Sequence, residues 1–137
     1  MINKTLLKTT LQLIKDNPQY WDQQVWHCST THCFAGFVEL QLMDLPIYQD
    51  IDDLLILYYK DDFSYTFDTL YPSLDTQAFL SKYPFINSFY SRFELTKHIA
   101  SFALGLDSIQ SELLFNCDNT LDDLHRIVDT LCNISCT

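Results

Sequence analysis

The sequence predicts an all-α fold, a single compact domain of about five to six helices. The chain has only two glycines and four prolines in 137 residues, which leaves little material for tight β turns. Hydrophobic residues make up 47% and aromatic residues 15%, so a chain of this length can enclose a substantial core. Across most of the chain the apolar residues recur at the spacing of helices.

The first helix is expected over residues 3–16, where Leu7, Leu11 and Ile14 form one apolar stripe. Pro18 disfavours helical dihedral angles at Asn17, so this helix should end there. A connector over residues 19–28 carries both tryptophans of the chain and leads to the next helix.

A second helix is expected from Thr31 to about Met43, with Ser29 or Thr30 as its N-cap. Its central part is apolar on nearly every side, and only Glu39 is charged. Such a helix belongs in the centre of a domain, because it has no face suited to water.

The middle of the chain, at about 44–90, is an acidic, aromatic-rich expansion. Within it, residues 51–60 have apolar residues at helical spacing and predict a third helix. Phe63, Tyr65 and Phe67 alternate with period two, which predicts one short extended segment near 63–67. Asp75 is expected to cap a short helix that ends before Pro84.

The last third of the chain predicts further helices with clear ends. Residues 92–104 form one, and Gly105 suits the left-handed position that follows a helix. Asp107 and Gln110 have the spacing of a capping box at the start of the next helix. Three apolar residues of that helix are expected to face the core: Ile109, Leu113 and Leu114. Thr120 and Asp123 repeat the capping pattern for a final helix, whose apolar stripe is Leu121, Leu124, Ile127, Val128 and Leu131.

The net charge excludes one class of partner. Eighteen acidic residues against eight basic ones give a formal charge of −10, which repels phosphate backbones, so we expect no nucleic acid as a partner.

We also expect no membrane partner, because the longest apolar run, residues 54–59, is far shorter than the ~20 residues that a bilayer requires. No secretion signal opens the chain, so the five cysteines are expected to be reduced in a cytoplasmic protein.

The strongest local concentration of reactive side chains is His27, Cys28, His32 and Cys33. These residues have the atom types of a zinc site, but two adjacent pairs do not match known ligand spacings. Cys33 could instead be a nucleophile near a helix N-terminus, with His32 or His27 as its base. Cys28 and Cys33 could also form a redox pair. The interpretation that we favour is structural, with both cysteines packed as small apolar side chains.

The same segment carries a family resemblance. The run from Cys28 to Phe37 resembles the Cys-Gly-Thr-x-x-Cys-x-Ala-Gly-Trp element of a family of small bacterial proteins of unknown function. The resemblance extends to residues 17–26 and, downstream, to Leu104-Gly105-Leu106 and Leu114-Phe115. Ser29 replaces the family's glycine and Phe37 its tryptophan. The resemblance implies a shared fold and supplies no mechanism.

These observations together predict a non-enzymatic, acidic module that binds another protein and needs no cofactor. A basic partner is one option that its negative charge allows. Tyrosines with a charged rim suit protein contacts, so the partner surface is predicted within residues 44–75. The residues expected to form it are Tyr48, Asp52, Asp53, Tyr59, Asp61, Asp62 and Tyr65. Two alternatives stay open: a thiol or zinc centre at Cys28 and Cys33, and an acidic decoy that mimics nucleic acid.

Overall fold

The computed structural model describes residues 2–25, 27–28, 31–48, 63–84 and 92–134. These residues form seven α-helices and one short hairpin, so the all-α prediction is confirmed and the expected number of helices was too low. The elements are α1 (Lys4–Asp16), a 3-10 turn (Pro18–Tyr20), β1 (His27–Cys28), β2 (Thr31–His32), α2 (Phe34–Leu42), α4 (Phe63–Leu70), α5 (Thr76–Lys82), α7 (Arg92–Leu104), α8 (Ser108–Phe115) and α9 (Leu121–Ile134).

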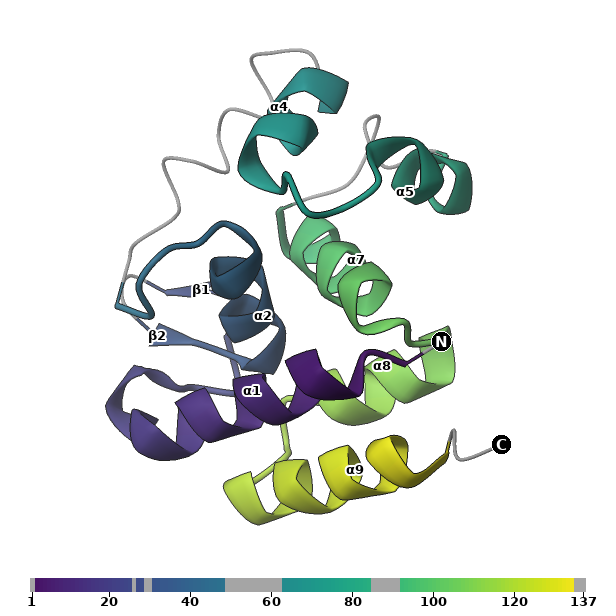
Figure 1. Ribbon diagram of the computed structural model, residues 1–137. Helices are drawn as coiled ribbons and strands as arrows, with labels where there is room; N and C mark the ends of the chain where they lie inside the picture. The colour runs from purple at the N-terminus through teal and green to yellow at the C-terminus, as the bar shows by residue number, and fades with distance from the viewer. Residues whose placement is uncertain (1, 26, 29–30, 49–62, 85–91, 135–137) are drawn as a thin grey trace.

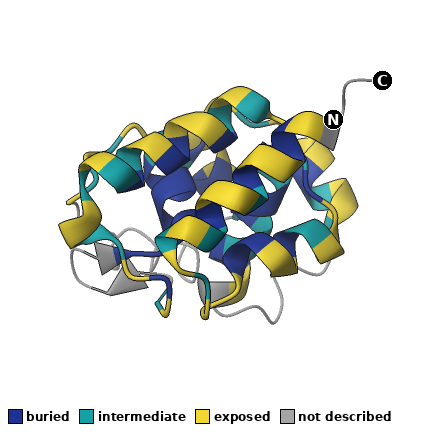
Figure 2. Cartoon of the chain, turned by 90° about the horizontal axis from the view of Figure 1, so that it is seen from below, coloured by how far each residue is buried: buried dark blue, intermediate teal, exposed yellow. Residues whose placement is uncertain are grey.

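Helix α2 lies at the centre of the arrangement and packs against α1, α7 and α8 (Figure 1). Helix α1 also packs on α9, while α4 and α5 pair at the opposite end of the molecule. The helices turn their buried faces inward and their exposed faces to solvent (Figure 2). Every residue of α2 from Phe34 to Leu40 is buried, which confirms the predicted central helix.

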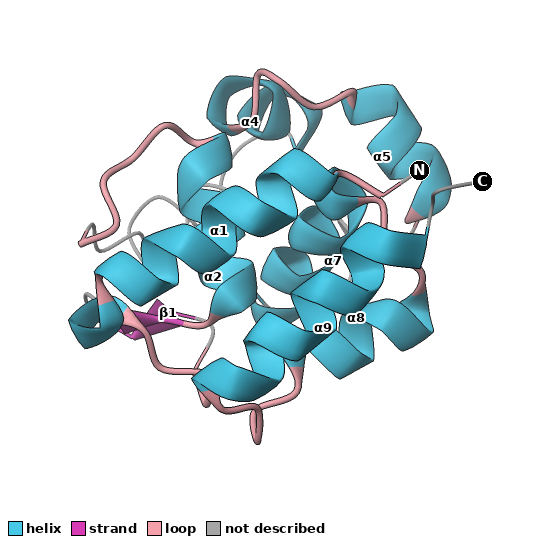
Figure 3. Cartoon of the chain, turned by 60° about the horizontal axis from the view of Figure 1, so that its bottom comes forward, coloured by secondary structure: helices cyan, strands magenta, loops and turns pink. Residues whose placement is uncertain are grey.

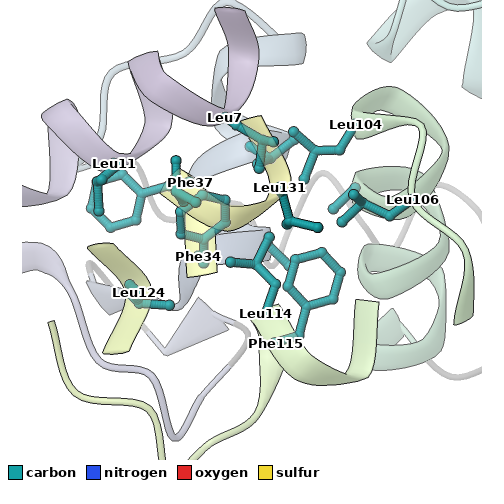
Figure 4. Close-up of a cluster of buried hydrophobic side chains, with 14 of the residues drawn as sticks. Leu7, Leu11, Phe34, Phe37, Leu104, Leu106, Leu114, Phe115, Leu124 and Leu131 are labelled. Atoms are coloured by element: carbon teal, nitrogen blue, oxygen red, sulfur yellow. The ribbon is translucent and has the colours of Figure 1, made fainter. Parts of the chain in front are cut away.

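Two clusters of buried side chains hold these helices together. Helices α8 and α9 lie side by side below α2 and help to enclose the larger cluster (Figure 3). Its members come from α1, α2, α8, α9, the end of α7 and the turn that follows α7. Figure 4 labels ten of them: Leu7, Leu11, Phe34, Phe37, Leu104, Leu106, Leu114, Phe115, Leu124 and Leu131. The smaller cluster joins α4, α5 and α7 through Phe67, Tyr71, Phe79, Leu95 and Ile99.

The predicted helix ends are confirmed where local chemistry decides them. Helix α1 ends at Asp16, directly before Asn17. Gly105 has φ 73°, and the amide of the next residue donates to the Ser101 carbonyl at 3.0 Å. Asp107 and Gln110 form the complete capping box at α8. The remaining two caps also form, with Asp75 accepting from the Ala78 amide and with Thr120 and Asp123 bonded reciprocally.

The extended segment predicted near 63–67 is wrong, because these residues begin α4. The Phe63 and Phe67 rings stack at 6.0 Å, and Phe67 lies 5.1 Å from the Tyr71 ring. This spacing of four residues places the rings on one helical face. Phe67 also lies 4.5 Å from the Phe79 ring of α5, so burial against that helix selects the helical alternative.

The predicted start of the second helix is also wrong. Thr31 and His32 form β2, and α2 begins at Phe34 with Cys33 as its N-cap residue. Ser29 and Thr30, the expected caps, lie outside the described residues, as does the helix predicted over 51–60. The Phe34 amide instead donates to the side-chain oxygen of Gln23 at 3.2 Å. A residue eleven positions away therefore satisfies an amide in the first turn of α2.

Two residues predicted to face the core do not. Ile109 is 78% exposed and Leu113 is 53% exposed, whereas Leu114 is buried as expected. Ser111, Leu114 and Phe115 are the buried residues of α8, and their spacing places them on one helical face. Ile109 and Leu113 therefore point outward. None of the helices in the described residues is both long and apolar enough to cross a membrane.

Candidate functional site

The segment that contains His27, Cys28, His32 and Cys33, which we call the Cys/His element, forms a small antiparallel hairpin ahead of α2. His27 lies opposite His32 and Cys28 opposite Thr31. The connector lies beside this hairpin, because Trp21 forms a parallel β-bridge with His32. The Asp22 amide donates to the His32 carbonyl at 2.9 Å. The sequence prediction of a helix at this point missed the hairpin, since two strands of two residues carry almost no periodic signal.

The side chain of Gln23 fastens the connector to two helices. Its amide nitrogen donates to the Leu114 and Asn116 carbonyls at the end of α8, each at 3.1 Å. Its amide oxygen accepts from the Phe34 amide at the start of α2 and from the Trp21 indole at 3.1 Å. Gln23 is 6% exposed, so these four hydrogen bonds satisfy a polar group that burial would otherwise penalise. We call this arrangement the Gln23 clamp.

The Gln23 clamp brings together the separate segments that carry the family resemblance. Residues 17–26 supply Gln23, the run from Cys28 to Phe37 supplies Phe34, and the Leu114-Phe115 pair supplies a carbonyl. Leu104 and Leu106, from the remaining segment, lie in the same hydrophobic cluster. In this chain these residues share a structural task, which is the attachment of α2 and α8 to the connector.

Cys33 is a buried free thiol that packs in the larger cluster. Burial raises its pKa from 9.0 to about 12, and the amides of Gly36 and Ala35 lower it by less. The thiol is therefore protonated at neutral pH, which disfavours Cys33 as a nucleophile even though it precedes a helix N-terminus. This environment suits the packing role that the sequence analysis favoured.

The other members of the Cys/His element are described only in part. His32 is buried, and its ring meets the Phe37 ring edge-on at 6.0 Å. The side chains of His27 and Cys28 lie outside the described part of the chain. In the part that is described, no three His, Cys, Asp or Glu residues lie together as metal ligands would.

The predicted partner surface is described only at two of its residues. Tyr48 is 56% exposed and Tyr65 is 69% exposed, as a contact surface requires. Tyr48 lies beside the Tyr20 ring at 6.3 Å, whereas Tyr65 belongs to α4, so the two come from different elements. The other predicted members lie outside the described residues: Asp52, Asp53, Tyr59, Asp61 and Asp62.

Sequence reasoning missed a buried carboxylate at the junction of the two clusters. Glu39 of α2 is fully buried and accepts a hydrogen bond from the Thr96 hydroxyl of α7 at 2.9 Å. The Tyr71 hydroxyl, beyond the end of α4, donates to its other oxygen. A single acid within a helix that is otherwise apolar was the available signal, because a buried carboxylate requires donors around it. Glu39 thus links α2 to α7 and to the residue that follows α4.

Sequence reasoning also missed a groove between α8 and α9. The groove is open to solvent and has a volume of about 370 Å³. Leu113 forms one wall, and successive turns of α9 form the other. The residues that line it are Leu113, Asn119, Asp123, Arg126, Ile127 and Thr130.

Comparison of the chain with protein-family models, curated proteins and solved structures finds no match. The family resemblance stated above therefore stays a prediction.

Proposed function

We propose that this protein is a non-enzymatic binding module that holds a basic, amphipathic helix of a partner protein in the groove between α8 and α9. The observation that carries this proposal is the exposure of Ile109 and Leu113, at 78% and 53%. The two residues are one helical turn apart and form an aliphatic strip along α8. Adjacent exposed aliphatic side chains are typical of a docking surface, whereas a single exposed one is ordinary.

The groove beside this strip can receive the apolar face of a helix. Leu113 belongs to both, so the strip continues into the groove. Ile127 provides a second apolar side chain on the opposite wall, and it is partly buried against the core. Amphipathic helices bind such surfaces through apolar residues spaced by one turn, which match the spacing of Ile109 and Leu113.

The charge around the groove selects a basic partner. The helices α8 and α9 and the turn between them carry five acidic residues, Glu112, Asp118, Asp122, Asp123 and Asp129, against a single arginine. That arginine, Arg126, is paired with Asp123, so its charge is balanced within the groove wall. An acidic rim around an apolar strip attracts lysines and arginines that flank an apolar face.

A binding role also agrees with the environment of Cys33. Its protonated, buried thiol supports packing and gives no reason to place a reaction there. We expect the protein to act in the cytoplasm without a cofactor. Tyr48 and Tyr65, which the sequence placed on the partner surface, are exposed and provide a competing location for the same activity.

The test uses a synthetic helical peptide with leucines on one face and lysines on the other. Its binding to the full chain is measured by fluorescence anisotropy, with a glutamate version of the peptide as the negative control. Leu113→Lys should weaken binding about tenfold or more, because it removes an apolar contact and adds a like charge. Tyr65→Lys makes the same change in charge at an exposed site and should alter binding less than about twofold.

Two outcomes would refute the proposal. If Leu113→Lys and Tyr65→Lys weaken binding equally, the peptide responds to net charge alone, as a decoy that mimics nucleic acid would. If Tyr65→Lys alone weakens it, the partner surface lies within residues 44–75.

A further inference from the structure

A second pocket lies where the end of α5, the last turns of α7 and the start of α8 meet. Its volume is about 160 Å³. A site for one ordered water needs only roughly 10–15 Å³, so this pocket has room for a polyatomic group. Figure 1 shows α5, α7 and α8 along one side of the molecule. The pocket is separate from the α8–α9 groove, since no residue lines both.

The lining of this pocket is basic, in contrast to the rest of the chain. Lys82, Lys97 and His98 all border it, although the whole sequence has eight lysines and arginines against eighteen acids. The Lys82 ammonium lies 5.6 Å from the centre of the Tyr83 ring, and that ring packs on His98 at 4.4 Å. Within the described residues neither Lys82 nor Lys97 forms an ion pair.

The positive charges act on one place. Burial lowers the pKa of His98, Glu94 raises it, and Lys97 and Lys82 lower it further. Both lysines thus oppose protonation of His98, with which they share the pocket lining. The Glu94 carboxylate oxygen Oε2 lies 3.7 Å from Nε2 of the His98 ring.

Hydroxyl groups complete the lining. Ser101 and Ser111 are buried and share one hydrogen bond of 2.7 Å. The two hydroxyls have two hydrogens between them, so this bond leaves one hydrogen for a ligand. Asp107 is the acidic residue of the lining, and its carboxylate accepts from the Gln110 amide at 2.8 Å as the cap of α8.

We propose that this pocket binds the phosphate group of a small phosphomonoester. A phosphate carries close to two negative charges at neutral pH, which matches two lysines that have no carboxylate partner in the described chain. Its oxygens accept hydrogen bonds from ammonium and hydroxyl donors, which are the groups that Lys82, Lys97 and the serine pair present. The first turn of α8 is not needed, because Asp107 already caps it.

The test is an NMR titration of the full chain at constant ionic strength, in which the chemical shifts of the backbone amides and the His98 imidazole report binding. The probes are inorganic phosphate, glycerol phosphate and, as a singly charged comparison, acetate. Saturable shifts of Lys97, His98 and Ser111 with either phosphate probe are expected, and tighter binding of glycerol phosphate would identify a phosphorylated small molecule over the free ion. The bound anion should also raise the pKa of His98.

Lys97→Met and Lys82→Met should each weaken phosphate binding about tenfold, because each removes a charge-assisted contact. Lys8→Met, which makes the same change at an exposed site on α1, should leave it unchanged. Thermal unfolding of each variant establishes that it is folded. Equal loss in Lys8→Met, equal affinity for acetate, or shifts that fail to saturate would each overturn the proposal. This inference does not rest on the proposed helix-binding function.

Discussion

Replacing Gln23 with methionine should destabilise the protein clearly more than a substitution at an exposed site. Methionine keeps the length and nearly the volume of glutamine but removes both halves of its amide. The Gln23 clamp would lose its donor to the Leu114 carbonyl and its acceptor for the Phe34 amide, and both of these hydrogen bonds are buried. Its bonds to Asn116 and Trp21 are partly buried, so water can replace them.

The magnitude follows from the buried Phe34 amide, which the substitution leaves without its acceptor. A buried backbone donor or acceptor that loses its partner costs about 1–3 kcal/mol. The Phe34 amide is such a group, whereas the Leu114 carbonyl still accepts from the Asn119 side-chain amide at 3.0 Å. The expected loss is therefore about 1–3 kcal/mol. A domain of this kind is stable by only about 5–15 kcal/mol, so the effect is a large share of its total stability.

Urea denaturation followed by circular dichroism measures the loss, because a chain of 137 residues is short enough for two-state unfolding. Gln24→Met is the matched control, since its side chain is exposed and should change the free energy of unfolding by less than about 0.5 kcal/mol. Hydrogen exchange at the Phe34 amide reports the same event locally and should become faster in Gln23→Met. If the two variants unfold within about 0.5 kcal/mol of each other, the clamp does not hold the connector to α2 and α8.

Three further predictions concern stability. Asp44 has φ 55° after the end of α2, so Asp44→Gly should stabilise the protein by about 0.5–1 kcal/mol in urea titrations, and a loss of stability would contradict this. Because burial raises the pKa of Cys33 from 9.0 to about 12, folding favours its neutral thiol. The contribution of this thiol to the free energy of unfolding is complete below pH 9. It is lost as the pH rises toward 12, at up to about 1.4 kcal/mol per pH unit. In urea titrations at a series of pH values, Cys33→Ala should remove this part of the decrease in stability with pH. Tyr71→Phe removes a donor to buried Glu39 and should cost about 1.5–3 kcal/mol by denaturation, whereas Tyr65→Phe should cost less than about 0.5 kcal/mol.

The helix boundaries that were predicted correctly depend on residues close together in the chain. Helices end or begin through hydrogen bonds to residues within one turn at Asn17, Gly105, Asp107 and Thr120. The local sequence is therefore enough to predict these boundaries. The apolar stripe of α1 was also recognisable, because its spacing alone places Leu7, Leu11 and Ile14 on one face.

The errors occur where two local alternatives have similar merit. Phe63 and Phe67 satisfy both a strand alternation and a helical repeat, and the Phe79 ring of another helix decides between them. In α8, one apolar face had to be chosen from two, and Leu114 rather than Ile109 and Leu113 meets the core. The surface proposed for partner binding therefore consists of residues that local patterning had assigned to the interior.

The sequence by itself determined a helical, acidic domain, its principal caps and its central helix, because these follow from composition and from contacts within a turn. Tertiary structure alone decided the start of α2, the burial of Glu39 and the outward face of α8. The Gln23 bond to Leu114 spans 91 residues, and the Glu39 bond to Thr96 spans 57. Such partners are chosen by how whole helices pack, and no local pattern of one chain segment specifies which distant segment will meet it.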